Sequence, residues 1–250
     1  MTELPPFVTG IAVMYERDAL HGIVVGSTSE WHRAGLSRRQ LATLISSGQL
    51  GTVRRGAFAT ASILARAAED PRLAHAVAVA GAIATGRNGG VGSHYSAARI
   101  YGIDLLSKPD GDTVTLTLPP GTRTGRSGGR SGQRELACHV AALPDAHATQ
   151  AFFGVKVTTG SRTVVDIARR STFMEGVVAM DSALQGRHAS YAEIRRVLAA
   201  GTGWPGINQA KKVTEFASGL SESVLESCAR VVFHEHGLPT PELQARVHDD

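Results

Sequence analysis

The chain has 250 residues, enough for two small domains or one large one. Hydrophobic residues make up 42% of it, a share that is ordinary for a globular protein and argues against wholesale disorder. The formal net charge of +4 fits a nucleic-acid partner only weakly, so the positions of the arginines are more informative than their number.

Several classes of protein are excluded by simple patterns. Cys138 and Cys228 have neither C-x-x-C nor His-Cys ligand spacing, so we expect reduced cysteines, no disulfide framework and no bound metal. The first ten residues, MTELPPFVTG, lack the basic and apolar regions of a secretory signal. The longest apolar stretch, 73–84, is interrupted by His75 and is too short to span a bilayer. These patterns predict a cytoplasmic protein with no membrane partner.

The amino-terminal part is predicted to begin a small DNA-binding domain. Residues 1–10 contain two adjacent prolines and are expected to form an irregular arm, and 14–21 to form a helix. Residues 24–25 are a candidate short strand. Three apolar side chains are expected in the core of this region: Val13, Leu20 and Ile23.

Two helix starts follow, ten residues apart. Ser27 and Ser37 each begin an S-x-x-E or S-x-x-Q pattern, the spacing of a capping box. Gly35 lies between them in a short turn typical of a helix-turn-helix. Gly48 is expected just past the end of the second helix.

The second of these helices has two unlike faces. On a wheel of 100° per residue, Leu41, Leu44 and Ile45 share a narrow stripe that should pack inward. Arginine, glutamine and hydroxyl groups face outward, where they could contact base edges and phosphates in the major groove. The side chains of this segment predicted to contact DNA are Ser37, Arg38, Arg39, Gln40, Thr43 and Ser46.

A short alternating run, 50–59, is predicted to be a hairpin. Val53 and Phe58 should pack inward, while Arg54 and Arg55 project from the tip toward phosphate or the minor groove. An amphipathic helix and a hairpin with ordinary surface arginines are the alternative. The order of two capped helices, a glycine turn and a basic hairpin favours a winged helix-turn-helix that binds double-stranded DNA.

The middle of the chain carries no recognisable catalytic motif. Residues 62–84 are predicted to form one or two buried helices, broken near 70–71 where a proline is tolerated. The glycine-rich stretch 86–92 lacks the Gly-Lys-Ser/Thr ending of a phosphate-binding loop and is expected to be a plain turn. Residues 93–102 should form a short helix in which His94 is a structural, hydrogen-bonded histidine.

A small sheet and further helices should follow. The strand candidates are 112–118, 134–143 and 154–159, and the helix candidates are 161–170, 172–184 and 190–199. The Gly/Ser/Arg-rich stretch 122–133 is expected to be mobile, either as an arm that touches phosphate or as a solvated hairpin loop. Asp166 and Asp181 are lone carboxylates on helices and should be structural.

Three sequence stretches resemble one known family. The stretches AGLSRRQLATLISSGQLGTVRRGAFAT, GSHYSAARIYGI and VTTGSRTVVDIAR, in this order, are similar to the AbiEi-type antitoxins and transcriptional regulators of actinobacteria and their phages. The resemblance covers residues 22–199. It implies that an amino-terminal winged helix represses the protein's own operon and that a carboxy-terminal domain counters a nucleotidyltransferase-type toxin.

Residues 221–250 resemble the beginning of the Vsr-like endonuclease domain that follows this regulator in longer relatives. Glu226 matches an early helical glutamate of that domain, but the Glu242-Leu243-Gln244 pattern has no well-placed aspartate before it. Since a nuclease needs several carboxylates to hold a metal ion, nuclease activity is not expected. His234 and His236 should point to different faces of a helix, which excludes a zinc-peptidase site.

Together these patterns predict an α+β protein: a winged helix-turn-helix (1–61), a mixed α/β domain with a small sheet and several helices (62–219), and a helix with a tail (220–250). The expected function is a sequence-specific repressor of the antitoxin type, with no enzymatic activity, catalytic residues, cofactors or metal. Its expected partners are operator DNA with an inverted repeat, a second copy on that DNA and a cognate nucleotidyltransferase-type toxin. A toxin-neutralising protein with secondary DNA binding, or a nuclease remnant, is the alternative.

Overall fold

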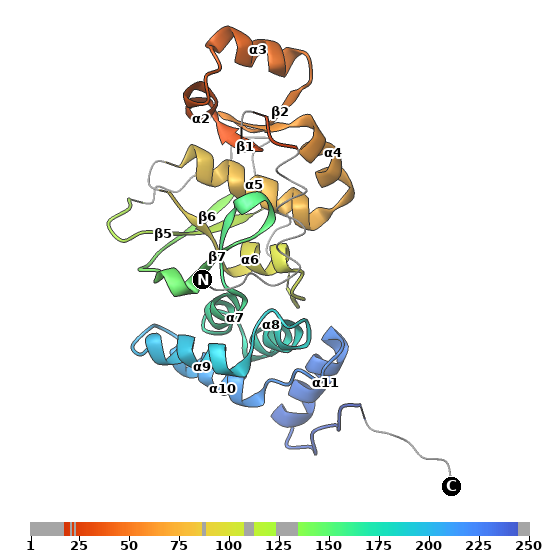
Figure 1. Ribbon diagram of the computed structural model, residues 1–250. Coiled ribbons are helices and arrows are strands. Elements are labelled where there is room, and N and C mark those ends of the chain that lie inside the picture. Colours follow the sequence, from red (N-terminus) through yellow and green to blue (C-terminus); the bar gives the residue numbers. More distant parts are fainter. Residues whose placement is uncertain are drawn as a thin grey trace. The chain divides into compact units, whose positions relative to one another are not determined.

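The structure is a computed structural model that describes residues 18–244 except 21, 23, 87–88, 108–112 and 124–134. The described part is a mixed α+β structure, as predicted (Figure 1). It contains ten α-helices and two sheets. The chain divides into two compact units. Unit 1 is formed by 1–96 with 110–158, and unit 2 by 97–109 with 159–250.

The first sheet of unit 1 has three antiparallel strands. β1 (Val25–Ser27), β3 (Ala57–Thr60) and β2 (Leu50–Arg54) lie side by side in that order. The short strand expected at 24–25 is thus confirmed one residue later, where Val25 pairs with Ala59. The expected hairpin is β2 and β3.

Two short helices cover one face of this sheet. α2 (Thr28–Arg33) and α3 (Arg38–Ser46) pack onto a core of four buried side chains: Trp31, Leu36, Leu41 and Leu50. The indole of Trp31 is fully buried and its Nε1–H donates to the Gly26 carbonyl at 3.1 Å. Leu20 and Phe58 pack against this core as predicted. Val13, Ile23 and most of the helix expected at 14–21 lie outside the described residues; the described residues 18–20 are not helical.

Two longer helices cover the other face. α4 (Ala61–Glu69) and α5 (Pro71–Thr85) are separated at Asp70, whose carboxylate accepts hydrogen bonds from the first backbone N–H groups of α5. The predicted helix break is therefore confirmed. Val53 of the hairpin lies over Gly81 of α5. A Cβ added at residue 81 would come within 2.7 Å of a Val53 methyl group. The hairpin and α5 can therefore approach this closely only because residue 81 is glycine.

The second sheet of unit 1 has five strands in the order β6-β5-β4-β8-β7, with parallel pairs at β5·β6 and β4·β8. Their bounds are β4 (Val91–Gly92), β5 (Val114–Leu118), β6 (Leu136–Val140), β7 (Ala148–Gln150) and β8 (Lys156–Thr158), with 3-10 turns η1 (Asp145–His147) and η2 (Phe152–Gly154). The three predicted strands are confirmed as β5, β6 and β8. The glycine-rich stretch is not a plain turn throughout, because its last two residues form the central strand β4.

Unit 2 is helical. α6 (His94–Tyr101) leads into it, and α7 (Gly160–Ala168), α8 (Phe173–Gln185), α9 (Tyr191–Ala200), α10 (Ile207–Phe216) and α11 (Val224–Glu235) follow. All of these except α10 were predicted. α7 is buried along its whole length and packs against α8, α9 and α10.

Buried ion pairs hold the helices of unit 2. The Asp166 carboxylate accepts from Arg162 at 2.7 Å and from Arg169 at 2.9 Å. Asp181 accepts from Arg230 at 2.8 Å and from the Ser227 hydroxyl at 2.8 Å. Asp181 thus joins α8 to α11, and Asp166 pairs within α7 and its carboxy-terminal cap, as their predicted structural role requires.

The compact units do not follow the predicted domain boundaries at 61/62 and 219/220. α4 and α5 pack on the three-stranded sheet, and α5 also packs on β5 of the five-stranded sheet, so unit 1 continues well past residue 61. The boundaries themselves stay a prediction. Among the described residues, no helix combines the length and the hydropathy needed to cross a bilayer.

Candidate nucleic-acid interface

The α2-turn-α3 segment is fixed by side-chain caps at both helix starts. The Ser27 hydroxyl accepts from the Glu30 N–H at 3.3 Å, and Glu30 accepts from the Ser27 N–H at 2.7 Å. Ser37 and Gln40 form the same reciprocal pair at the start of α3. The turn between the helices uses Gly35 at φ +100°, a left-handed conformation that favours glycine. Both predicted capping boxes are therefore present.

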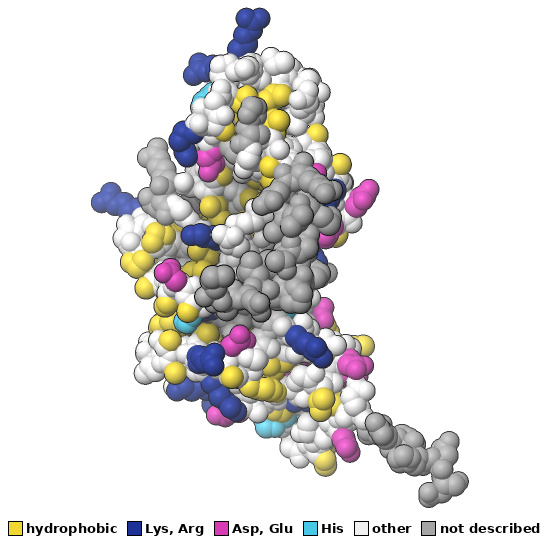
Figure 2. Space-filling model, viewed as in Figure 1, with side chains coloured by type: hydrophobic (Ala, Val, Ile, Leu, Met, Phe, Trp, Pro, Cys, Tyr) yellow, Lys and Arg dark blue, Asp and Glu magenta, His cyan; other side chains and the backbone are white. Residues whose placement is uncertain are grey.

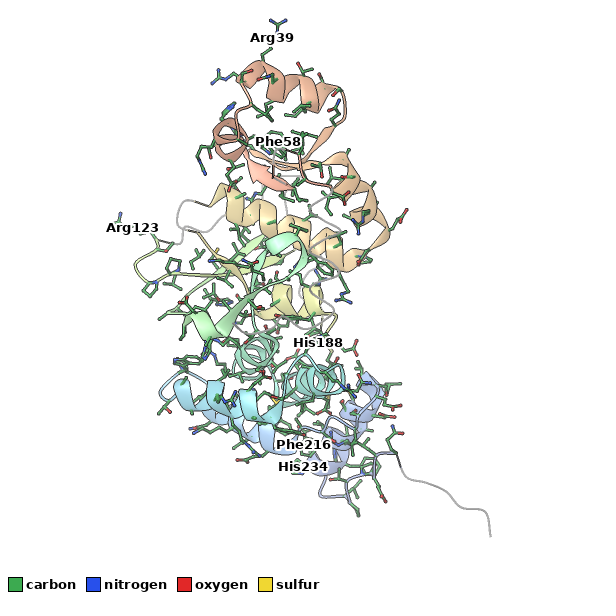
Figure 3. All side chains as sticks on the ribbon, viewed as in Figure 1. Arg39, Phe58, Arg123, His188, Phe216 and His234 are labelled. Carbon is green, nitrogen blue, oxygen red and sulfur yellow. The ribbon has the colours of Figure 1, made fainter. Side chains whose placement is uncertain are left out.

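α3 presents two unlike faces. Leu41 is buried, and Leu44 and Ile45 pack against the same core. The side chains predicted to contact DNA on the other side are exposed: Ser37, Arg38, Arg39, Gln40, Thr43 and Ser46. In Figure 3 Arg39 points away from the unit, on the opposite side of α3 from Phe58. The inward stripe and outward polar face predicted for α3 are thus confirmed.

The hydroxyl groups on the outer face are engaged with the helix itself. Thr43 Oγ1 donates to the Arg39 carbonyl at 3.0 Å, and Ser46 Oγ donates to the Thr43 carbonyl at 3.0 Å. A hydroxyl has one hydrogen but two lone pairs, so each oxygen can still accept a hydrogen bond. In this arrangement the hydroxyls suit amino groups at base edges better than they suit phosphates.

The surface around the start of α3 is cationic. Arg33, at the end of α2, is exposed beside the turn that leads to Arg38 and Arg39. No aspartate or glutamate occurs anywhere from Trp31 to Ala68. Figure 2 shows dark-blue side chains projecting from the end of unit 1 that carries these helices. The positive end of the α3 dipole adds to this field, so the surface attracts phosphate.

The two arginines at the hairpin tip differ from each other. Arg55 is exposed, whereas Arg54 is half-buried near Cys138 of β6. Burial lowers the pKa of Arg54, and burial also raises the pKa of the Cys138 thiol despite the nearby guanidinium. Only Arg55 therefore projects as predicted, while Arg54 packs beside the five-stranded sheet. The turn itself is tied to α2, because the Thr28 N–H donates to the Gly56 carbonyl at 3.0 Å.

Arg33 was not among the predicted contact residues. Its position at the last turn of the first helix, a few residues before the arginines of α3, was the signal in the sequence for its place in this cationic surface. Of the predicted arm 122–133, only Thr122 and Arg123 are described, and Arg123 is exposed (Figure 3). The remainder lies outside the described residues.

The residues considered for catalysis or metal binding have structural contacts. His94 is buried, lies within 3.0 Å of the Ser93 hydroxyl through Nδ1 and stacks on His139. Glu226 accepts from the Glu222 N–H at 2.6 Å at the start of α11. Within the part of the chain that the structure describes, no three His, Cys, Asp or Glu side chains gather as a metal site. Cys138 and Cys228 are free thiols.

Comparison with known proteins adds relatives but no assigned activity. No model of a known protein family matches the chain. The uncharacterized Mycobacterium tuberculosis proteins Rv2248 (strain H37Rv) and MT2308 (strain CDC 1551) are each 29% identical over 214 residues, which covers 85% of this chain and 70% of theirs. The crystal structure of the RV2827C protein from Mycobacterium tuberculosis is similar over 85% of this chain and 78% of that one, at 18% identity and a TM-score of 0.43.

Proposed function

We propose that α2, α3 and the β2-β3 hairpin form a winged helix-turn-helix and that the protein binds operator DNA as a transcriptional repressor. The observation that supports this most strongly is the outer face of α3. Its arginines, amide and hydroxyls are exposed together while its apolar stripe packs on the sheet. A helix of this kind can enter the major groove with its polar face toward the base edges.

Each exposed side chain has a distinct role in this proposal. Arg39, Gln40 and Thr43 meet base edges, because they lie along the outward side of α3. Arg33, Arg38 and Arg55 meet the phosphate backbone on either side of the groove. Arg54 contributes indirectly, because its half-buried side chain fixes the hairpin that presents Arg55.

The regulator is proposed to be of the antitoxin type. The resemblance to AbiEi-type regulators supports this assignment, since it extends beyond the DNA-binding segment into α6 and α7. The protein then represses its own operon at an inverted repeat and counters a nucleotidyltransferase-type toxin. A test in cells is co-expression with a nucleotidyltransferase encoded beside it: growth should be arrested by the enzyme alone and restored by the pair.

DNA binding is tested by titrating the protein onto a fluorescent duplex from its own promoter. Wild-type protein should bind with an affinity that falls steeply with salt. The double substitution of Arg38 and Arg39 by Ala should reduce the affinity by at least about a hundredfold, or 2.7 kcal/mol. The matched control is Arg195→Ala on α9, also an exposed helical arginine, which should bind like wild type. Equal binding by the double variant would refute the interface.

A further inference from the structure

Unit 1 contains a cavity of about 600 Å³ next to α2. Its walls come from three parts of the unit that are far apart in the sequence: the segment from Gly22 through α2, the carboxy-terminal end of α5, and the turn η2 with the start of β8. α2 and that end of α5 lie next to each other in Figure 1. The volume of the cavity is in the range of sites that hold a small organic molecule.

The larger uncharged side chains on the wall are apolar. They are four half-buried residues and one buried residue: Val24, Val25, Ile83, Phe153 and Val155. Apolar surface of this kind gains free energy when an apolar group displaces water from it. The cavity therefore favours a ligand with an apolar body.

Phe153 is held at the cavity in a conformation that phenylalanine rarely adopts. Its φ is +42° and its ψ is +35°, and Gly154 follows at φ +79°. The Ala151 N–H donates to the Val155 carbonyl at 2.9 Å, and the Val155 N–H donates to the Phe152 carbonyl at 3.0 Å, so the turn is closed. A bulky residue at positive φ is strained, and such strain persists where the surrounding fold fixes a side chain, often at a ligand site. The ring of Phe153 is thus a fixed part of the wall.

The charges on the wall do not balance. Arg33 of α2 and Lys156 of β8 are exposed, and neither forms an ion pair with any residue that the structure describes. The third charge is Glu30, whose Oε2 already accepts from the N–H and the hydroxyl of Ser27, both at 2.7 Å. Two cations and one engaged carboxylate leave a net positive charge, so the cavity favours an anion.

We propose that this cavity binds a small organic carboxylate with an apolar body. The carboxylate pairs with Arg33 and Lys156, and the body packs against Ile83 and Phe153. An inorganic anion would leave the apolar wall in contact with water, and an uncharged molecule would leave the two cations without a partner. An apolar carboxylate satisfies both parts of the wall.

Such a ligand competes with DNA for Arg33. Under the proposed function Arg33 meets the phosphate backbone, and it lies on the helix whose Trp31 packs in the core beneath α3. An Arg33 guanidinium that is paired with the ligand no longer neutralises a phosphate, so the ligand should weaken operator binding. This consequence rests on the proposed function, whereas binding of the carboxylate does not.

The first test measures ligand binding by the full chain without DNA. The probes are naphthoate, an aromatic carboxylate, and its uncharged amide, each titrated by isothermal titration calorimetry. Naphthoate should bind with a dissociation constant below about 1 mM, and the amide should bind at least about tenfold more weakly. Absence of naphthoate binding, or an amide that binds as tightly as naphthoate, would overturn the proposal.

Three substitutions locate the site by its charges. Lys156→Gln should weaken naphthoate binding at least about threefold, because it removes one cation from the wall. Glu30→Gln should strengthen binding and keep the helix cap, since Gln40 forms the same capping box at α3. Lys211→Gln, at an exposed position of α10, is the matched control for the loss of a positive charge and should bind like wild type. Equal effects of Lys156→Gln and Lys211→Gln would refute the site.

The effect on DNA is measured separately, by titrating the protein onto its promoter duplex with and without saturating naphthoate. The probe should lower the affinity at least about threefold and reduce the slope of log affinity against log salt by about one. By linkage, the duplex should lower the affinity for naphthoate by the same factor. A protein that binds naphthoate but no DNA would refute the proposed function and support the cavity assignment. DNA binding that naphthoate leaves unchanged would refute the competition for Arg33.

Discussion

Gln40 Oε1 accepts two hydrogen bonds from Ser37, one from its backbone N–H at 2.9 Å and one from its hydroxyl at 2.7 Å. A carbonyl oxygen has two lone pairs, so this amide oxygen is fully used. Only the Nε2 donors remain for the proposed contact with DNA. Gln40 therefore suits the acceptors of guanine, thymine or phosphate, whereas the paired donor and acceptor contact to adenine would require breaking the cap.

This relationship predicts the effect of Gln40→Glu. A glutamate keeps the capping box, as Glu30 does with Ser27 on the preceding helix, so the thermal midpoint should stay within about 2 °C of wild type. The same change replaces two donors, which in the proposed complex meet base edges, by a negative charge that the nearby phosphates repel. Affinity for the operator should fall at least about tenfold in a fluorescence titration. Unchanged affinity would show that Gln40 lies outside the interface.

Arg39→Ala should relax sequence preference more than it weakens non-specific binding. Arg39 lies on the outward face of α3, where its guanidinium can contact two acceptors of one guanine. Removing one such contact costs about 1 to 3 kcal/mol of discrimination at that base pair. Competition between the operator and single-base variants measures this difference. Equal losses on all sequences would instead assign Arg39 to the phosphate backbone.

The two hairpin arginines should behave differently despite being adjacent. Arg55→Ala should weaken binding to all sequences and reduce the slope of log affinity against log salt by about one, as expected for the loss of one phosphate contact. Arg54→Ala should leave that slope closer to wild type, because Arg54 is half-buried beside Cys138. The same variant should slow alkylation of Cys138, since the guanidinium favours the thiolate. A larger salt effect for Arg54 than for Arg55 would contradict this assignment.

The Asp181 and Arg230 pair should be essential for the stability of unit 2. Asp181→Asn leaves the buried Arg230 guanidinium without its counter-charge, and breaking a buried pair in this way costs about 3 to 5 kcal/mol. Glu215→Gln, on an exposed position of α10, is the matched control and should change stability by less than about 0.5 kcal/mol. Urea unfolding of both variants measures the difference. A small effect for Asp181→Asn would indicate that water reaches the pair.

Local signals in the sequence were sufficient to predict the structure of α2, α3 and the turn between them. Capping boxes and glycine turns involve residues within four positions of one another, and Ser37, Gly35 and Gly48 all adopt the expected roles. The apolar stripe of α3 could also be predicted from neighbouring residues alone. Its helical period is visible in the sequence without knowledge of the side chains that the stripe contacts.

The sequence did not predict two elements, α10 and β4, that depend on tertiary contacts. α10 begins after Gly206 without a side-chain cap, so no start signal was present. Its glycine at φ +77° is required by the close Arg169 carbonyl, a contact that the sequence does not reveal. β4 has two residues and exists because Gly92 fits between Val79 and Val157.

The hairpin arginines illustrate the same limit. Arg54 and Arg55 look equivalent in sequence, but the strand register shifts between Thr52 and Arg54. Such a bulge redirects side chains locally. Arg54 is therefore half-buried while Arg55 remains exposed.

The most direct test of the proposed function is selection from a random pool of duplex DNA, carried out in parallel with wild-type protein and Arg39→Ala. Wild type should enrich one motif, arranged as an inverted repeat, and the variant should enrich a motif that has lost preference at one base pair of each half-site. Enrichment of no motif by wild type, or of an identical motif by both proteins, would contradict recognition of DNA through α3.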